Sequence, residues 1–248
     1  MRSSRSGRPD EARRPAWLTA APYAHRGLHG QGRVENSRSA FEAAIAAGFG
    51  IECDLQIARD GEAAVFHDYE LGRLTAEQGR VSDLTLAELQ RVKLAGSAET
   101  IPSLPEVLEL IGGRAPVLLE LKRQRQRGSA LCPPVLEALR SYQGQAAVMS
   151  FDPQVGQWFS SRAPKVIRGL VVTESGRRGA RGALGRWLAL WGARPDFLAY
   201  DIRDLPSRFA SRQRALGLPI LTWTVRSGRD EEVASACADQ IIHELPPR

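Results

Sequence analysis

Eight short apolar runs, separated by helix-like stretches, constrain the fold of this chain more than any other feature. The runs are Ala21–Ala24, Gly50–Gln56, Pro116–Leu121, Ala146–Phe151, Val166–Val172, Phe197–Tyr200, Pro219–Val225 and Gln240–His243. Eight strand–helix alternations in about 230 residues match a closed (β/α)8 barrel, the TIM barrel. An open doubly wound sheet is the alternative, but no glycine-rich phosphate loop follows the first run. Hydrophobic residues are 43% of the chain, which is ample for a sizeable core.

Helical patterns occupy the stretches between these runs. They include Ser37–Ala47, Pro133–Ser141, Pro153–Ser161, Gly182–Leu190 and Pro206–Leu216. Asn36 or Ser37 is a natural N-terminal cap for the first of these helices, and Gly48 is a natural end. We therefore expect an α/β protein in which 17–248 form a single barrel domain.

A small insert after the second strand interrupts the alternation. Arg59-Asp60-Gly61 has the composition of a hairpin turn, and Ala63–Phe66 reads as a returning strand that carries His67. Residues 69–115 then form the insert, in which Thr85–Leu94 and Ser103–Ile111 are expected to be helical. We also expect Trp17 and Leu18 to fill the place of a closing helix, because the sequence shows almost none after the last apolar run.

The net charge of +6 and the pI near 9.7 arise largely from three basic segments. These are residues 1–16 with five arginines, Lys122–Arg127, and the group Arg177, Arg178, Arg181 and Arg186. Residues 1–16 lack apolar periodicity, which predicts a disordered basic tail. The other two segments fit either solvated surfaces or an electropositive mouth that attracts an anionic substrate. Nucleic-acid binding is not expected, because no aromatic residues are interleaved with these charges.

Cysteine usage and the apolar runs indicate a cytoplasmic protein. The cysteines Cys53, Cys132 and Cys237 are few, odd in number and far apart, which argues for a reducing compartment. No apolar run approaches the ~20 residues of a transmembrane helix. The start is rich in arginine but has no apolar core of a secretory signal.

Two histidines and three carboxylates lie at or just after the predicted strands. His25 ends the first strand, Glu52 and Asp54 lie on the second, His67 follows the returning strand and Glu120 lies near the end of the third barrel strand. Two histidines can exchange protons near neutral pH, and three carboxylates suit a hard divalent cation such as Mg²⁺ or Ca²⁺. This combination favours hydrolysis of a phosphate ester. The alternative for the carboxylates on the second strand is a salt bridge to Arg26 or Lys122.

Local motifs, taken in order, resemble the glycerophosphodiester phosphodiesterase family. They are His-Arg-Gly at 25–27, Glu-Asn-Ser at 35–37, Ile-Glu-Cys-Asp at 51–54, Asp-Gly at 60–61, His-Asp at 67–68, Glu-Leu-Lys at 120–122, Ser-Phe at 150–151 and Thr-Trp-Thr-Val at 222–225. The resemblance implies a barrel whose insert covers its mouth. It also implies cleavage of a small glycerophosphodiester to glycerol 3-phosphate and an alcohol, with one cation held by Glu52, Asp54 and Glu120.

The same resemblance, together with side-chain chemistry, suggests roles for the remaining residues of the site. His25 and His67 are expected to be the catalytic acid and base, in an order left open. The phosphate contacts are expected from Arg26 and from Lys122, unless Lys122 instead supports Glu120. We expect supporting or pocket-lining positions for Glu35, Asn36, Asp68, Phe151 and Trp223. Asn36 is expected first of all to cap a helix. The alternative for Phe151 and Trp223 is packing in the barrel core.

Two other functions remain open at this point. A lysophospholipase D would need an apolar groove for an acyl chain, and a catalytically inactive barrel would serve as a binding protein. The nucleophile is either water or the neighbouring glycerol hydroxyl. His243-Glu244 and Arg226 depart from the usual family pattern, and we expect them to reshape the alcohol side of the pocket.

Overall fold

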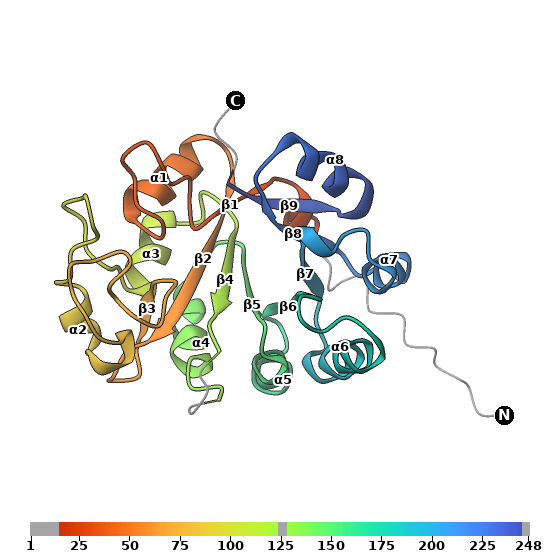
Figure 1. The fold of residues 1–248 in the computed structure, drawn as a ribbon. Helices are drawn as coiled ribbons and strands as arrows, with labels where there is room; N and C mark the ends of the chain where they lie inside the picture. Colours follow the sequence, from red (N-terminus) through yellow and green to blue (C-terminus); the bar gives the residue numbers. More distant parts are fainter. Residues whose placement is uncertain (1–14, 124–127, 245–248) are drawn as a thin grey trace.

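A closed parallel barrel forms the centre of the protein (Figure 1). The computed structural model describes residues 15–123 and 128–244. Its eight parallel strands are β1 (Tyr23–His25), β2 (Gly50–Ile57), β4 (Val117–Leu121), β5 (Ala146–Ser150), β6 (Ile167–Val172), β7 (Phe197–Asp201), β8 (Ile220–Val225) and β9 (Gln240–His243). Pairing of β1 with both β9 and β2 closes the ring. The expected TIM barrel is confirmed, and the open sheet is excluded.

Helices surround the barrel between successive strands. They are α1 (Arg38–Ala46), α4 (Cys132–Ser141), α5 (Pro153–Arg162), α6 (Ala180–Ala193), α7 (Arg208–Ala215) and α8 (Gly228–Cys237), with the short 3-10 turn η4 (Ile202–Asp204) after β7. The side chain of Ser37 accepts a hydrogen bond from the amide of Ala40, so Ser37 is the N-cap of α1. Gly48 follows the end of α1 with a φ of +75°, as expected for a helix end.

The insert covers one side of the barrel mouth, at the left of Figure 1. The returning strand β3 (Ala63–Val65) pairs antiparallel with β2 and leads into the insert, which contains η3 (Val81–Asp83), α2 (Leu86–Leu89) and α3 (Leu104–Ile111). The prediction of a helix over 85–94 was wrong beyond α2. Val92 and Leu94 are buried while Lys93 is exposed, and this alternation packs an extended segment into the insert's own core.

The lower end of the barrel is closed by apolar side chains. Leu18, on the 3-10 helix η2 (Ala16–Thr19), is 1% exposed and packs with Tyr23 and Leu118 in the barrel interior. The hydroxyl of Tyr23 donates a hydrogen bond to the carbonyl of Leu18 over 3.1 Å. Trp17 packs against the same cluster, so this segment belongs to the barrel.

The predicted tail over 1–16 extends too far, because Ala16 already begins η2. Residues 1–14 lie outside the described part of the chain, as do 124–127 of the basic segment after Glu120. Across the described ranges, the structure has no helix long and apolar enough to cross a membrane.

Candidate active site

The carboxylate cluster is positioned by the register of two neighbouring strands. Glu52 and Asp54 point to the same face of β2, while Cys53 packs in the core between barrel and helices. Glu120 lies directly beside Asp54 in the pairing of β2 with β4. Each of the three residues offers an oxygen within 4.8 Å of the others, and all three are buried. The predicted ligand set is therefore assembled at one point of the barrel mouth.

Asp54 is surrounded by two cations and an amide. Its Oδ1 is 2.7 Å from Lys122 Nζ, and its Oδ2 is 3.1 Å from Arg26 Nε. Asn36 Nδ2 donates a hydrogen bond to Oδ2 over 2.9 Å. Burial alone would raise the pKa of Asp54, but the charges of Lys122 and Arg26 hold it well below its usual value. In this structure Asp54 therefore forms salt bridges to Arg26 and Lys122, which was the alternative to metal binding.

Glu52 differs from Asp54 because one of its oxygens lacks a partner. The backbone amide of Arg26 donates to Oε2 over 3.2 Å, whereas Oε1 is buried without a hydrogen bond among the described residues. Burial, and then the charges of Asp54 and Glu120, raise the pKa of Glu52 well above its usual value. A buried oxygen of this kind is costly unless a cation satisfies it. The geometry and the chemistry of this donor set fit a divalent cation.

A tight turn after β1 brings Arg26 into the site. Arg26 itself has a φ of +59°, and the following Gly27 has a φ of +77°. A Cβ on Gly27 would lie 2.8 Å from the carbonyl carbon of Ala40, so only glycine fits there. The guanidinium of Arg26 also reaches Glu35 Oε1 at 2.7 Å. Lys122 is likewise 2.7 Å from Glu120 Oε1, which is the supporting contact considered for it.

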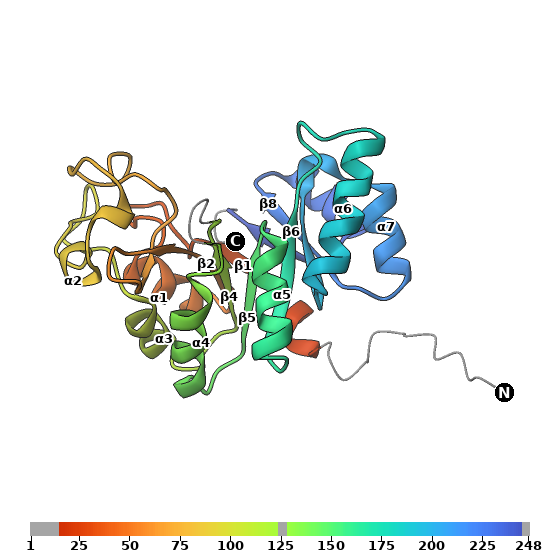
Figure 2. The same ribbon diagram turned by 90° about the horizontal axis from the view of Figure 1, so that it is seen from below.

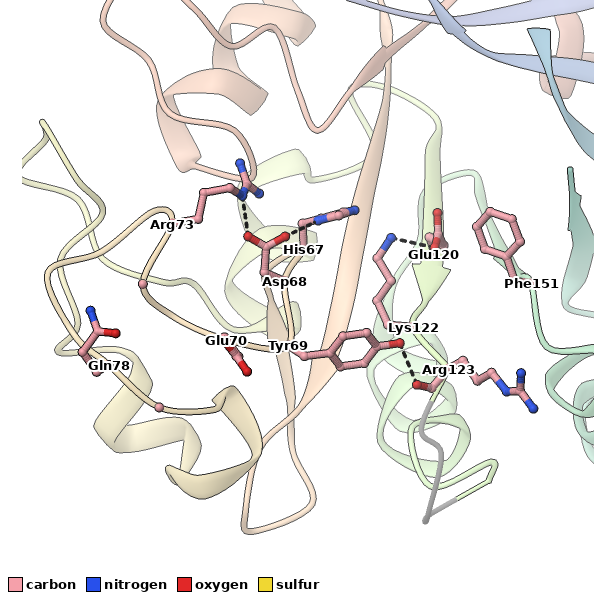
Figure 3. Close-up of a pocket in the computed structure, with 12 residues that line it drawn as sticks. His67, Asp68, Tyr69, Glu70, Arg73, Gln78, Glu120, Lys122, Arg123 and Phe151 are labelled. Atoms are coloured by element: carbon pink, nitrogen blue, oxygen red, sulfur yellow. Dashed lines mark hydrogen bonds and ion pairs between the residues drawn. The ribbon is translucent and has the colours of Figure 1, made fainter. Parts of the chain in front are cut away.

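His67 is held by a chain of ionic contacts in the insert. Its Nδ1 is 2.6 Å from Asp68 Oδ1, Asp68 pairs with Arg73, and Arg73 Nη2 is 2.7 Å from Glu35 Oε1. Figure 3 shows the ring of His67 extending from Asp68 towards Lys122 and Glu120. Burial, followed by the positive charges of Lys122 and Arg26, lowers the pKa of His67 despite the opposing effect of Asp54. His67 is therefore neutral near pH 7.

His25 is oriented by a residue that lies far away in sequence. Its Nδ1 is 2.5 Å from Oε1 of Glu244, which directly follows β9, and its Nε2 is 3.9 Å from Glu52 Oε2. Arg226 Nε lies 2.6 Å from the second oxygen of Glu244. Burial opposes ionisation of Glu244, but the hydrogen bonds from His25 and Arg226 lower its pKa to about 2. The role of Glu244 was missed from the sequence, although its departure from the family pattern was visible.

Two adjoining pockets open above these groups. The inner one has a volume of about 580 Å³. Its walls include eight of the predicted site residues, namely His25, Arg26, Glu52, His67, Glu120, Lys122, Phe151 and Trp223. The outer one, of about 810 Å³, shares four of those residues and extends along Asp68, Tyr69 and Arg73 of the insert (Figure 3).

Phe151 and Trp223 form an aromatic part of the pocket wall. Their rings meet edge to face with centroids 5.6 Å apart, and the indole of Trp223 donates to the carbonyl of Ala199 over 2.8 Å. Phe151 is 41% exposed, so it is a pocket residue and not part of the barrel core. Trp223 lines the pocket while also packing against the core cluster, which combines both roles considered for it.

Comparisons with known proteins identify the family of this chain. The model of the glycerophosphoryl diester phosphodiesterase family matches residues 25–242. A glycerophosphodiester phosphodiesterase from Caldanaerobacter subterraneus subsp. tengcongensis is 38% identical over 241 residues, covering 90% of this chain and 93% of that protein. Another from Bacillus altitudinis is 39% identical over 136 residues, which are 51% of this chain and 55% of that protein.

Solved structures share the fold over nearly the whole chain. A phosphodiesterase from Oleispira antarctica, in complex with sn-glycerol-3-phosphate, has a TM-score of 0.81 at 23% identity and covers 93% of this chain and 95% of its own. A glycerophosphodiester phosphodiesterase from Thermotoga maritima has a TM-score of 0.72 at 22% identity, covering 90% and 94%. The family match, together with the full-length relative, shows that this chain belongs to the glycerophosphoryl diester phosphodiesterase family of hydrolases.

Proposed function

We propose that the protein hydrolyses small glycerophosphodiesters to glycerol 3-phosphate and an alcohol, in the cytoplasm and with one divalent cation. The observation that carries this proposal is the carboxylate cluster flanked by His25 and His67. Each histidine is held through Nδ1 by a carboxylate, which leaves Nε2 for proton transfer. The bound product in the Oleispira antarctica structure supports the substrate class.

Glu52, Asp54 and Glu120 would hold the cation. Their donors are carboxylate oxygens, which suit Mg²⁺ or Ca²⁺. When bound, such a cation stabilises negative charge on the phosphate oxygens during cleavage. Because the ammonium group of Lys122 now contacts both Asp54 and Glu120, we expect it to shift towards the pocket when the cation binds.

The charge balance of the site supports a role for a cation in binding an anionic substrate. With Glu52 protonated, Asp54 and Glu120 are balanced by Arg26 and Lys122, so the site without metal has no spare positive charge for a phosphodiester. Arg26 and Lys122 then contribute positive charge beside the phosphate, in the role expected from the sequence.

The two histidines divide the proton transfers. His67, which is neutral near pH 7 because of its lowered pKa, is assigned as the base that activates the attacking hydroxyl. His25, oriented by Glu244, is then assigned as the acid that protonates the departing alkoxide. Both water and the neighbouring glycerol hydroxyl are compatible with this division.

A turnover assay with glycerophosphocholine tests the proposal. Glycerol 3-phosphate release should stop when the protein is treated with a chelator and resume on addition of Mg²⁺ or Ca²⁺. Lysophosphatidylcholine is assayed in parallel, and faster turnover of this lipid would favour the lysophospholipase D alternative. Full activity in excess chelator would contradict the cation, and inactivity on both substrates would favour a binding protein.

A further inference from the structure

The outward face of α6 carries large apolar side chains. Leu184, Trp187, Leu188 and Trp191 have exposed fractions of 60%, 38%, 60% and 77%. They recur at the spacing i, i+3, i+4, i+7, which is typical of the face that a helix buries. In this helix the barrel is instead contacted through Ala189, Leu190 and Ala193 on the opposite side. Leu184, Leu188 and Trp191 therefore face away from the barrel, while Trp187, the least exposed of the four, packs edge to face against Phe209 of α7 with ring centroids 5.4 Å apart.

The concentration of these residues on one helix is unusual. Seven large hydrophobic residues are exposed within the described ranges, and four of them form this stripe. Figure 2 shows α6 on the outer side of the barrel, remote from the insert and its α2. Soluble proteins rarely expose contiguous apolar patches, and such patches commonly mark contacts with proteins or membranes.

Positive charge accompanies the apolar stripe. The segment Ser175–Pro195 contains five arginines and no acidic residue. Arg177, Arg178 and Arg181 are exposed at the start of the helix. Arg178 pairs with Asp204 over 3.3 Å, while Arg177 and Arg181 have no ion pair among the described residues. Two exposed cationic side chains therefore remain available beside the stripe.

We propose that the α6 face is a docking surface for an anionic phospholipid bilayer. A helix with tryptophan and leucine on one face and arginine at its edge lies in the interfacial region of a membrane, where its cations attract anionic headgroups. A second copy of the chain fits this surface less well, because a twofold contact would bring the same arginines against one another. This docking does not depend on the proposed reaction.

A groove connects the docking surface with the active site. It has a volume of about 720 Å³ and runs from Arg177 and Arg181 to Arg123 and Phe151, which also line the outer pocket. When α6 lies on a bilayer, this side entrance of the site is held next to the lipid surface. Positive charge along the groove would then favour capture of phosphodiesters released there.

Vesicle co-sedimentation of the full-length protein tests the docking surface. One set of vesicles consists of phosphatidylcholine, and the other includes about one third phosphatidylglycerol to supply negative charge. The wild type should bind the anionic set at least about tenfold more strongly, because each cation near such a surface strengthens binding appreciably. L188S/W191S and R177S/R181S should each weaken this binding at least about tenfold.

A matched variant and a soluble-substrate assay separate docking from other effects. R91S/K93S removes two exposed cations from the insert and should leave vesicle binding within about twofold of wild type, since these charges lie on another surface. L188S/W191S should keep its turnover of glycerophosphocholine and its melting temperature. Equal binding to both vesicle types, or unchanged binding by L188S/W191S, would overturn the proposal. A concentration-dependent dimer that L188S/W191S dissociates would also overturn it, in favour of a second copy as the occupant.

Discussion

The two halves of the barrel mouth are built from different chemistry. The half formed by β1, β2 and β4 contains buried charges, including Glu52, Asp54 and Lys122. The half formed by β5 to β8 faces the same pocket with Met149, Val171 and an aromatic pair, together with paired charged side chains such as Asp201 and Arg203. Figure 1 shows these two groups of strands on opposite sides of the barrel.

We infer from this difference that the half with buried charges carries out the reaction and that the aromatic half contacts the rest of the substrate. Buried charges persist only when paired, and nearly every charged group in the first half has a partner of opposite charge. The unpartnered oxygen of Glu52 is the exception, and it lies where a cation is expected. The aromatic half also presents charged side chains, but Asp201 pairs with Arg203 and Arg226 pairs with Glu244. Among the described residues, no group of carboxylates suited to a cation lies in that half, which adds apolar and aromatic surface to the pocket. Changes in the first half should therefore reduce kcat, while changes in the second should mainly alter KM.

The largest effect is expected from the two histidines. His25→Ala and His67→Ala should each reduce kcat at least about a hundredfold at saturating metal, because each removes one proton transfer. The double variant should lose far less than the product of the two losses, since the pair acts as a unit. Steady-state kinetics on glycerophosphocholine give these values, and melting temperatures show whether the variants remain folded.

His29 provides the control, because it is close to Glu244 at 3.9 Å but is not part of the proposed acid–base pair. His29→Ala should be close to wild type. The acid limb of the kcat/KM profile should lie below pH 6.5, since the pKa of His67 is lowered and its protonated form cannot act as base. Normal turnover by His67→Ala, combined with an inactive His29→Ala, would show that the wrong histidine was assigned.

The next effect concerns Glu52 and the cation. Burial and neighbouring carboxylates raise the pKa of Glu52, so the folded protein holds this proton more tightly than the unfolded chain. The metal-free protein should therefore lose stability as pH rises from the ordinary glutamate pKa through the raised value. Glu52→Gln should remove that loss and weaken cation affinity at least about tenfold, comparable with losses caused by disturbing a metal site.

Thermal unfolding with and without Mg²⁺ or Ca²⁺ measures both effects. A ligand at a hundred times its Kd stabilises a folded protein by about 2.7 kcal/mol, so the wild type should melt at a higher temperature with metal. Glu52→Gln should show a higher melting temperature without metal at neutral pH and a smaller increase with it. An identical metal-induced increase in both proteins would remove Glu52 from the ligand set.

A smaller loss is expected for Glu244→Gln. The substitution keeps the volume and a hydrogen-bond acceptor for His25 but removes the charge that orients it. We expect kcat to fall about tenfold, which is less than the roughly hundredfold or larger loss expected when a general acid is removed altogether. In the His25→Ala background the same change should add little, because residues that act through one another are not additive. Glu232→Gln, an exposed change on α8, should have no effect, and full additivity with His25→Ala would show that Glu244 acts independently.

The strands and the chemical groups on them were predictable because their signals are local. A strand buried on both faces is continuously apolar, and β2 shows this over its whole length, so Glu52 and Asp54 stand out within it. The contact between His25 and Glu244 was not predictable, since the two residues are 219 positions apart in sequence. It exists only because β9 pairs with β1 when the barrel closes.

Helix patterns failed where tertiary packing decides the outcome. The segment after α2 has apolar residues that fit a helix, but the core of the insert draws Val92 and Leu94 into an extended arrangement. In α6 apolar residues recur at helical spacing on two sides, and this pattern does not tell which side the barrel buries. The small side chains of Ala189 and Ala193 pack inward, and the larger residues remain outside.

The smallest effect is expected in the aromatic half of the mouth. An aromatic contact between Phe151 and the substrate that is worth about 0.5–1.5 kcal/mol corresponds to a factor of roughly 2 to 13 in an equilibrium constant. Phe151→Ala should therefore raise KM for glycerophosphocholine by about that factor while kcat stays near wild type. Its melting temperature should also be nearly unchanged, because Phe151 is 41% exposed. Leu216→Ala, an exposed change after α7, should alter neither constant. If Phe151→Ala instead reduced kcat a hundredfold, the aromatic wall would take part in the reaction. The proposed assignment of kcat to one half of the mouth and KM to the other would then be wrong.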